Sequence, residues 1–496
     1  MTEDRNSYRS ITKAIGLFGG VKVFQIIISI IKNKFLAVLL GPIGMGISGM
    51  ITSTTGLISS LTGFGLQTSS VREISQAYTS NDTEKISTKV SVLRKLVLFS
   101  GLLGSFVTFL FARNLSIWSF GNEDYTSSFK IVSVILFFDQ LCIGQTVLMQ
   151  GTFNYKYMAK ASMLGSLIGL FLTVPMYYFW KLKAIVPVII VTSLINLLLS
   201  WRYSRKIPIE NIKLSARQII SKGKIMLTLG IAIALTGVIN TGQVYILRLY
   251  IFHYGNIADV GLYTAGIAIA TSYIGVVLNA MASDFSPRLS AVASNNKLFT
   301  QTINRQMVLL ITILGPLIIT FVVFIKQLTL LLYSNKFIEI TGMIEWIMLG
   351  MFLRAISWCL SYGFIAKGNS KLFFWNELVA SLYSLLFSIL GYKFYRFTGM
   401  GIGFCMTYLL YSAQVYIICR KSFNYKLNRD FYKIVLPQIL ISFLFFFIIK
   451  LSGYNVFRYL IGCTEIFIIT YITYKQLDKI IDIRTILVSL KSKIRT

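Results

Sequence analysis

The sequence predicts an all-α polytopic membrane protein with about 14 transmembrane helices. First, 55% of its 496 residues are hydrophobic and only 13% are charged, whereas a soluble protein is typically about 25% charged. Second, the chain contains about 14 mostly apolar runs of the length, about 20 residues, that a helix needs to cross a bilayer. Third, these runs lack the polar–apolar alternation of membrane-spanning strands.

The apolar runs follow one another along the chain with short polar connections. The second run is rich in Gly, Ser and Thr, which suits a helix that packs closely in a bundle or lines a cavity. The N-terminus shows no signal-peptide pattern, so we expect the first run to be retained as a span. The predicted spans of the first half are 14–39, 43–68, 94–112, 128–150, 160–180 and 184–201. Those of the second half are 225–249, 260–284, 306–328, 343–366, 372–392 and 400–419, and two more follow at 434–450 and 457–474.

The charge distribution predicts the orientation of these spans. The chain has 48 Lys and Arg against 18 Asp and Glu, a formal net charge of +30. If the N-terminus is cytoplasmic, the loops on its side hold about 33 basic residues and the opposite loops about 9, as the positive-inside rule requires. An even number of spans then places both termini in the cytoplasm. A nucleic-acid-binding protein would need a solvated basic domain, and the runs leave no room for one.

A faint internal repeat relates the two halves of the chain. Gly46, in the stretch that joins the first two runs, corresponds to Gly261, in the stretch that joins the seventh and eighth. Arg72 corresponds to Arg288 at nearly the same offset. Chance similarity between Gly-rich apolar segments is the alternative. The repeat predicts two pseudo-symmetric six-helix lobes around a central cavity, as in many transporters. The predicted lobes are 1–210 and 211–430, followed by two additional helices and a cytoplasmic tail at 431–496.

Charged residues inside spans are candidate site residues because they are costly in lipid. In the first run, Lys22, Gln25, Ser29 and Lys32 lie within about 80° on one helix face, so we expect both lysines to face the cavity. Lys34 points the other way, and its side chain either reaches the lipid headgroups or serves the cavity. The basic residues assigned to membrane depth are Lys22, Lys32, Lys34, Lys130, Arg248 and Arg354.

Acidic residues in later runs are candidate coupling or counter-ion groups. Asp139 in the fourth run is either a counter-ion for a nearby lysine or a site for a proton or cation. Glu377 in the eleventh run is a candidate partner for Arg354 in the tenth. Asp284 lies at the inner end of the eighth run. Serines on these helices are explained by helix packing.

Several basic residues and few acids at membrane depth indicate an anionic substrate, such as a phosphate or diphosphate headgroup. The chain has no P-loop motif and no nucleophile–base constellation. No metal site, disulfide framework or cofactor is predicted, because His253 is the single histidine and the five cysteines show no paired spacing. These cysteines are Cys142, Cys359, Cys405, Cys419 and Cys463.

Five short segments, in order along the chain, resemble O-antigen translocases, a group that includes the flippase for the lipid-linked repeat of enterobacterial common antigen. They are KFLAVLLGPIGMG (34–46), FGNEDY (120–125), LGSLIG (164–169), SNKF (334–337) and IAK (365–367). The resemblance covers about residues 14–420 and implies the superfamily of multidrug, oligosaccharidyl-lipid and polysaccharide exporters, with two six-helix lobes around a central cavity. By position, the residues that fall where members of this group commonly have polar or charged residues are Lys22, Lys34, Arg248, Arg354, Lys367 and Glu377.

We therefore expect a transporter and not an enzyme: a flippase that moves an undecaprenyl-diphosphate-linked oligosaccharide from the inner to the outer leaflet of the bacterial cytoplasmic membrane. The expected substrate-binding residues are Lys22, Lys32, Lys34, Arg248, Arg354 and Lys367, and the expected coupling or counter-ion residues are Asp139, Asp284 and Glu377. Membrane lipids and other polysaccharide-assembly proteins are the expected further partners.

Three other functions are considered. A multidrug–cation antiporter of the same superfamily would have mainly acidic residues in its cavity. An O-antigen polymerase or ligase would need a substantial extracytoplasmic loop with catalytic Arg or His, and here these loops are short. A membrane scaffold would not need charged residues inside its spans.

Overall fold

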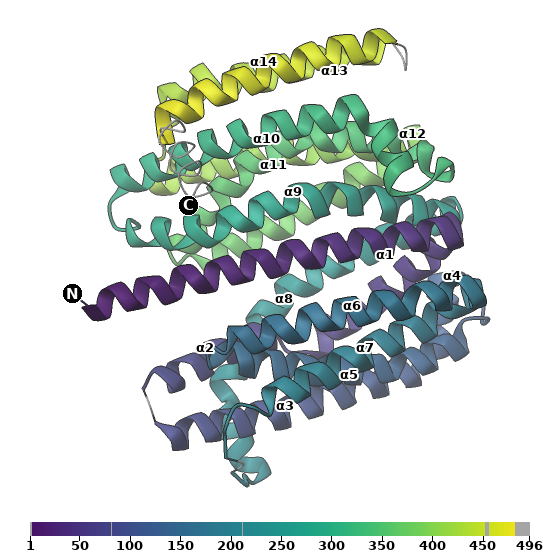
Figure 1. Ribbon diagram of the computed structural model, residues 1–496, viewed down its shortest axis with the longest axis vertical. Helices are drawn as coiled ribbons and strands as arrows, with labels where there is room; N and C mark the ends of the chain where they lie inside the picture. Colours follow the sequence, from purple (N-terminus) through teal and green to yellow (C-terminus); the bar gives the residue numbers. More distant parts are fainter. Residues whose placement is uncertain (1, 81, 211, 452–455, 482–496) are drawn as a thin grey trace, which may run out of the picture. The chain divides into compact units, whose positions relative to one another are not determined.

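A computed structural model describes residues 2–80, 82–210, 212–451 and 456–481, and in these ranges it is built from helices without any strand. Figure 1 shows long helices joined by short connections. The chain divides into two compact units, unit 1 from Met1 to Thr264 and unit 2 from Ala265 to Thr496. The predicted division at residues 210 and 430 follows the order of the spans and stays a prediction.

Unit 1 contains the first eight α-helices and the start of the ninth. They are α1 (Thr2–Thr62), α2 (Leu66–Thr79), α3 (Thr83–Leu110), α4 (Ala112–Phe120), α5 (Thr126–Gly151), α6 (Tyr155–Trp180), the 3₁₀ helix η1 (Lys181–Ala184), α7 (Ile185–Ser204), α8 (Ala216–Tyr254) and α9 (Ile257–Ala291). Side chains cap the starts of some of these helices. Asp82 accepts the backbone N–H of Lys85 at α3, and Ser215 and Gln218 form a capping box at α8.

Unit 2 contains most of α9 and the remaining helices. These are α10 (Asn296–Leu332), the 3₁₀ helix η2 (Asn335–Ile340), α11 (Thr341–Ala366), α12 (Ser370–Phe423), the π-helix η3 (Phe431–Val435), α13 (Leu436–Leu451) and α14 (Val456–Ile481). Helices α13 and α14 are the predicted additional pair. Both belong to unit 2, and α14 runs along α10, where Thr473 donates a hydrogen bond to the carbonyl of Thr312 at 3.0 Å.

Ten helices of the described chain are long and apolar enough to cross a membrane, and the bent pair Ile257–Ser272 and Ile274–Ala291 adds an eleventh if it is one span. Three of the ten, with 43, 50 and 54 residues, are each long enough for two spans. Counting these three twice and the bent pair once matches the fourteen predicted runs. The chain is therefore a multi-pass all-α membrane protein, as predicted.

Each double-length helix is interrupted where the chain turns from one span to the next. In α1 the break is Gly41, with φ 66° and ψ −166°, a conformation that only glycine adopts without strain, and it is followed by Pro42. The 3₁₀ turn η1 separates α6 from α7, and Tyr395 and Arg396 interrupt α12. These positions agree with the gaps between the predicted runs.

One predicted boundary is wrong. The sequence predicts that the second run continues to residue 68, but α1 ends at Thr62 and α2 starts at Leu66. Phe64 and Gly65 both have positive φ, so the helix cannot pass through them. The apolar residues beyond this turn belong to α2 and pack in the core of unit 1.

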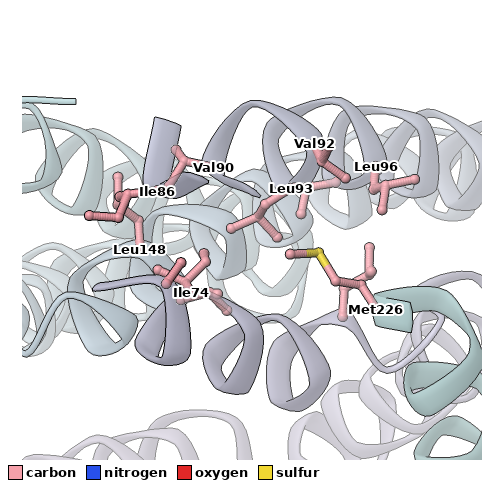
Figure 2. Close-up of a cluster of buried hydrophobic side chains, with 12 residues drawn as sticks. Ile74, Ile86, Val90, Val92, Leu93, Leu96, Leu148 and Met226 are labelled. Atoms are coloured by element: carbon pink, nitrogen blue, oxygen red, sulfur yellow. The ribbon is translucent and has the colours of Figure 1, made fainter. Parts of the chain in front are cut away.

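The core of unit 1 joins α2, α3, α5 and α8. Figure 2 shows side chains from these helices meeting, among them Ile74 of α2, Leu93 of α3, Leu148 of α5 and Met226 of α8. All four are at most 2% exposed. Partly buried Ile207, Ile209 and Leu214 pack against this cluster, so the basic segment between α7 and α8 is fixed to the core.

The two glycines of the internal repeat pack against each other inside unit 1. A Cβ atom on Gly46 of α1 would overlap the carbonyl oxygen of Ile257, and a Cβ on Gly261 of α9 would overlap the carbonyl oxygen of Pro42. In each case the blocking carbonyl lies four residues before the other glycine. This reciprocal contact is typical of a two-fold relation and supports the pseudo-symmetry that the repeat predicts.

We predict that Gly46→Ala and Gly261→Ala each destabilise the protein by about 1–3 kcal/mol or more, because the added methyl group overlaps backbone and not a movable side chain. Thermal unfolding of the purified protein in detergent measures the effect. Gly56→Ala in α1 is the matched control, since a methyl group added there would meet no atom within 4 Å. Equal melting temperatures for Gly261→Ala and Gly56→Ala would contradict the close helix contact.

Candidate functional site

Lys22, Lys32 and Lys34 lie on the first segment of α1, before the break at Gly41. Lys22 and Lys34 are exposed and Lys32 is half-buried. None of the three has an acidic partner among the described residues. They are therefore available cations in unit 1, and which of them bind substrate stays a proposal.

Asp139 lies in a polar seam between α5 and α7. Its carboxylate accepts a short hydrogen bond from the hydroxyl of Ser193. Further along the seam, Ser200 bonds the Cys142 thiol at 3.5 Å and Ser204 bonds Gln145 Oε1 at 2.6 Å. In the described structure no Lys or Arg makes an ion pair with Asp139, so a lysine counter-ion is not seen in this conformation.

A cavity of about 220 Å³ lies on α1, α2, α5 and α8, within unit 1. The turn at Gly63–Gly65 forms one side, and α5 and α8 form the others. Its wall is uncharged, and hydroxyl and amide groups of this kind can hydrogen-bond sugar hydroxyls. The polar lining residues are Ser59, Ser60, Gln67, Thr68 and Gln140. Sequence reasoning missed Gln140 and the turn, although the Ser- and Gly-rich composition of the second run indicated a helix beside a cavity.

Arg248 of α8 is engaged with the backbone of α1. Its Nη1 donates to the carbonyl oxygen of Gly49 at 2.6 Å, while its buried Nε has no partner among the described residues. One turn earlier, Tyr245 hydrogen-bonds Ser119 of α4 at 3.1 Å, and Ser119 bonds Thr54 of α1 at 3.2 Å. Arg248 therefore braces α8 against α1 in this conformation.

In unit 2 the structure brings Arg354 and Glu377 to two neighbouring tyrosines, Tyr408 and Tyr411 respectively. The Arg354 guanidinium lies over the Tyr408 ring, 5.7 Å from its centroid, and Tyr411 donates to Glu377 Oε1 at 2.7 Å. The rings of Tyr408 and Tyr411 make an edge contact at 6.4 Å. No Arg354–Glu377 ion pair forms in the described chain. The guanidinium thus keeps its charge for another partner.

Serines extend this cluster along α11. Ser361 bonds the Tyr411 hydroxyl at 3.2 Å and its own helix at Ser357. Ser357 in turn donates to the carbonyl oxygen of Arg354 at 3.0 Å. We call Arg354, Ser357, Ser361, Glu377, Tyr408 and Tyr411 the arginine–tyrosine cluster. It joins α11 to both segments of α12, so a shift of α12 would change what Arg354 contacts.

Lys367 and Asp284 lie at helix ends, away from this cluster. The Lys367 ammonium bonds the carbonyl oxygen of Ala293 and, at 2.7 Å, Asn296 Oδ1, so it fixes the turn before α10. Asp284 pairs with Arg288 one turn later on α9 at 2.5 Å, and both side chains are more than half exposed. Roles for these two residues in substrate binding or coupling stay predictions.

A buried ion pair in unit 2 was not predicted. Arg458 of α14 bonds Glu345 of α11 at 2.6 Å, with side chains 3% and 6% exposed, and also donates to the carbonyl oxygen of Val322 at 2.7 Å. The acid nearby on α14, Glu465, is 1% exposed, and neither carboxylate oxygen has a partner in the described chain. Arg458, Glu345 and Glu465 are charged residues inside or next to predicted apolar runs, and this position is the signal that could have identified them.

Comparison with known proteins identifies the family. The chain matches the family described as "Polysaccharide biosynthesis protein" over residues 35–342, more than half of its length. The chain belongs to this family. None of the curated proteins compared with it is significantly similar in sequence.

Solved structures similar to this polysaccharide biosynthesis protein share its fold. A lipid II flippase, MurJ, in an inward closed conformation has a TM-score of 0.70 at 15% identity, covering 93% of this chain and 99% of its own. An inward-facing multidrug resistance MATE family transporter of the MOP superfamily has a TM-score of 0.69 at 14% identity, covering 81% and 94%. A variant of the Vibrio cholerae MATE transporter VcmN has a TM-score of 0.59 at 14% identity, covering 86% and 98%. The predicted superfamily fold is thus confirmed.

We predict that Arg458→Met destabilises the protein by about 3–5 kcal/mol, because it leaves the Glu345 carboxylate buried without a cationic partner. Thermal unfolding in detergent measures this loss. The double variant Glu345→Leu with Arg458→Met should recover much of it, since both charges are then removed. Arg113→Met, which breaks the exposed Arg113–Glu123 pair, should hardly change the melting temperature. A double variant no more stable than Arg458→Met would argue against a stabilising pair.

Proposed function

We propose that the protein is a flippase for an undecaprenyl-diphosphate-linked oligosaccharide of the O-antigen type. It moves the repeat unit from the inner to the outer leaflet of the bacterial cytoplasmic membrane by alternating access. The supporting observation is the arginine–tyrosine cluster: a membrane-depth guanidinium that lies over the Tyr408 ring and has no acidic partner among the described residues, in a cluster that also holds serine and tyrosine hydroxyl groups. Membership of a polysaccharide biosynthesis family supports the class of substrate.

Each part of this arrangement suits one part of the proposed substrate. Arg354 presents planar N–H donors that match a diphosphate, and the tyrosine and serine hydroxyls can accept and donate to sugars. In unit 1, the lysines of α1 supply further positive charge. The small polar cavity beside Gln140 supplies hydroxyl and amide groups for sugar contacts. The polyprenyl tail would stay in lipid.

The membrane potential would assist the proposed direction of transport. A cytoplasmic side that is electrically negative favours outward movement of an anionic headgroup. Each charge contributes about 2.3 kcal/mol per 100 mV, so a diphosphate with two charges gains roughly 4–5 kcal/mol. Asp139 and Glu377 are the proposed coupling residues if an ion also drives the step. Both termini are proposed to be cytoplasmic, with other polysaccharide-assembly proteins as further partners.

We predict that Arg354→Ala lowers the flipping rate at least tenfold, because a diphosphate contact is worth more than about 1.4 kcal/mol when desolvated. The measurement is protection of a fluorescent undecaprenyl-diphosphate oligosaccharide from an externally added reagent in proteoliposomes. Lys22→Ala and Lys32→Ala should also reduce the rate. Arg354→Lys should be only partly active, because an ammonium lacks the planar pair of donors.

Lys371→Ala is the matched control, since it removes one exposed positive charge at the start of α12, outside the cluster. It should flip at the rate of the unchanged protein. Wild-type rates in all of Arg354→Ala, Lys22→Ala and Lys32→Ala, with normal membrane insertion, would overturn the proposed binding role.

Two results would point to another function. The MATE transporters share the fold, so drug resistance on expression, without flipping, would indicate a multidrug–cation antiporter. Formation of glycosidic bonds by the purified protein would indicate a polymerase or ligase. In a bacterial deletion strain, accumulation of the lipid-linked repeat unit on the cytoplasmic side is the result that the flippase proposal requires.

A further inference from the structure

Unit 2 contains a cavity that is separate from the arginine–tyrosine cluster. It has a volume of about 1180 Å³ and lies among the end of α9, the first half of α10, η3 and the end of α14. None of the residues of the arginine–tyrosine cluster contributes to its wall. Its apolar surface comes mainly from Val308, Leu309, Ile434, Tyr471 and Ile472.

Positive charge is concentrated around this apolar wall. Four basic residues, Arg288, Arg305, Lys433 and Lys475, line the cavity against one acidic residue, Asp430. The Arg288 guanidinium is already paired with the carboxylate of Asp284 and hydrogen-bonds Gln306 at 3.3 Å.

The remaining three bases, Arg305, Lys433 and Lys475, are available to a ligand. All three are exposed, and none has an ion-pair or hydrogen-bond partner for its charged group among the described residues. Asp430 is hydrogen-bonded by the side chain of Asn428 at 3.0 Å. The cavity therefore has unpaired positive charge on an apolar surface.

The position of the cavity along the helices indicates what fills it. It lies at the ends of α9, α10 and α14 that the positive-inside rule assigns to the cytoplasm. At that level a membrane presents phosphate groups above acyl chains, and anionic lipids attract basic residues there. A soluble phosphate would use the charges and leave the apolar wall in water, whereas a lipid matches both surfaces.

We propose that this cavity binds an anionic glycerophospholipid of the cytoplasmic leaflet. Arg305, Lys433 and Lys475 hold its phosphate, and the wall formed by α10, η3 and α14 receives the upper part of its acyl chains. The lipid would join η3 and the end of α14 to α10. The proposal does not require any particular transported substrate.

Binding is tested on the full-length protein, purified and delipidated in detergent, by native mass spectrometry with phosphatidylglycerol or phosphatidylcholine as the probe. Phosphatidylglycerol should bind at least tenfold more tightly. Each basic residue near a headgroup contributes about fivefold in affinity. The triple variant Arg305→Gln, Lys433→Gln, Lys475→Gln should therefore lose about a hundredfold, and Lys475→Gln alone about fivefold.

The matched control is the triple variant Lys297→Gln, Lys371→Gln, Lys421→Gln. It removes the same charge from exposed positions in unit 2 on the same predicted side, outside the cavity. It should retain wild-type affinity, and all variants should keep the melting temperature of the lipid-free protein. If the triple variant of the cavity does not fold, the affinity of the single variant Lys475→Gln for phosphatidylglycerol decides the test.

Three results would overturn the proposal: equal affinity for the two phospholipids, equal loss in both triple variants, or equal affinity for inorganic phosphate and for phosphatidylglycerol. Binding of undecaprenyl diphosphate in place of phosphatidylglycerol would also overturn it and would assign the cavity to the substrate. If the protein binds phosphatidylglycerol as expected but does not flip the lipid-linked oligosaccharide, the proposed function is contradicted and the proposed lipid site is not.

Discussion

Inside a bilayer every backbone N–H and C=O must find its partner within the protein, and this requirement organises the whole chain. It explains why the described residues form helices long enough to cross the membrane in one or two passes. It also restricts non-helical backbone to places where the loss of a helical hydrogen bond is tolerated. The glycine–proline break of α1, the 3₁₀ turn before α7 and the break in α12 all lie between spans.

The same low-dielectric environment governs the charged side chains. Arg458 meets Glu345, Asp139 meets a serine, and Glu377 meets Tyr411, so buried groups are largely satisfied by short polar contacts. Arg354 differs, because the ring face of Tyr408 and the Met351 sulfur leave its charge without an acidic partner among the described residues. This cation without an acidic partner is the basis of the anion-binding role proposed for Arg354.

Close backbone contact links the internal repeat to the tertiary structure. Gly46 and Gly261 are related by the repeat, and they also touch, each against the turn that precedes the other. A side chain at either position would separate the two helices. The weak similarity between the halves therefore has a structural counterpart at this pair of glycines.

The sequence alone determined the class of fold, the fourteen spans and the side of the membrane on which most of the charge is expected. These follow from hydropathy and charge, which act over about twenty residues and need no tertiary information. Sequence also selected Arg354 and Glu377 as unusual residues. The sequence could not predict that Tyr408 and Tyr411 would contact these two residues, because a tyrosine in an apolar run does not by itself indicate a site.

Only the tertiary structure decided how these groups are partnered. The pairing of Glu345 with Arg458, the engagement of Arg248 with the α1 backbone and the cavity among α9, α10, η3 and α14 join residues up to 199 positions apart. Such contacts depend on which helices pack together and in which register. A single sequence carries that information only in the combined packing of all its side chains, and not in any local pattern.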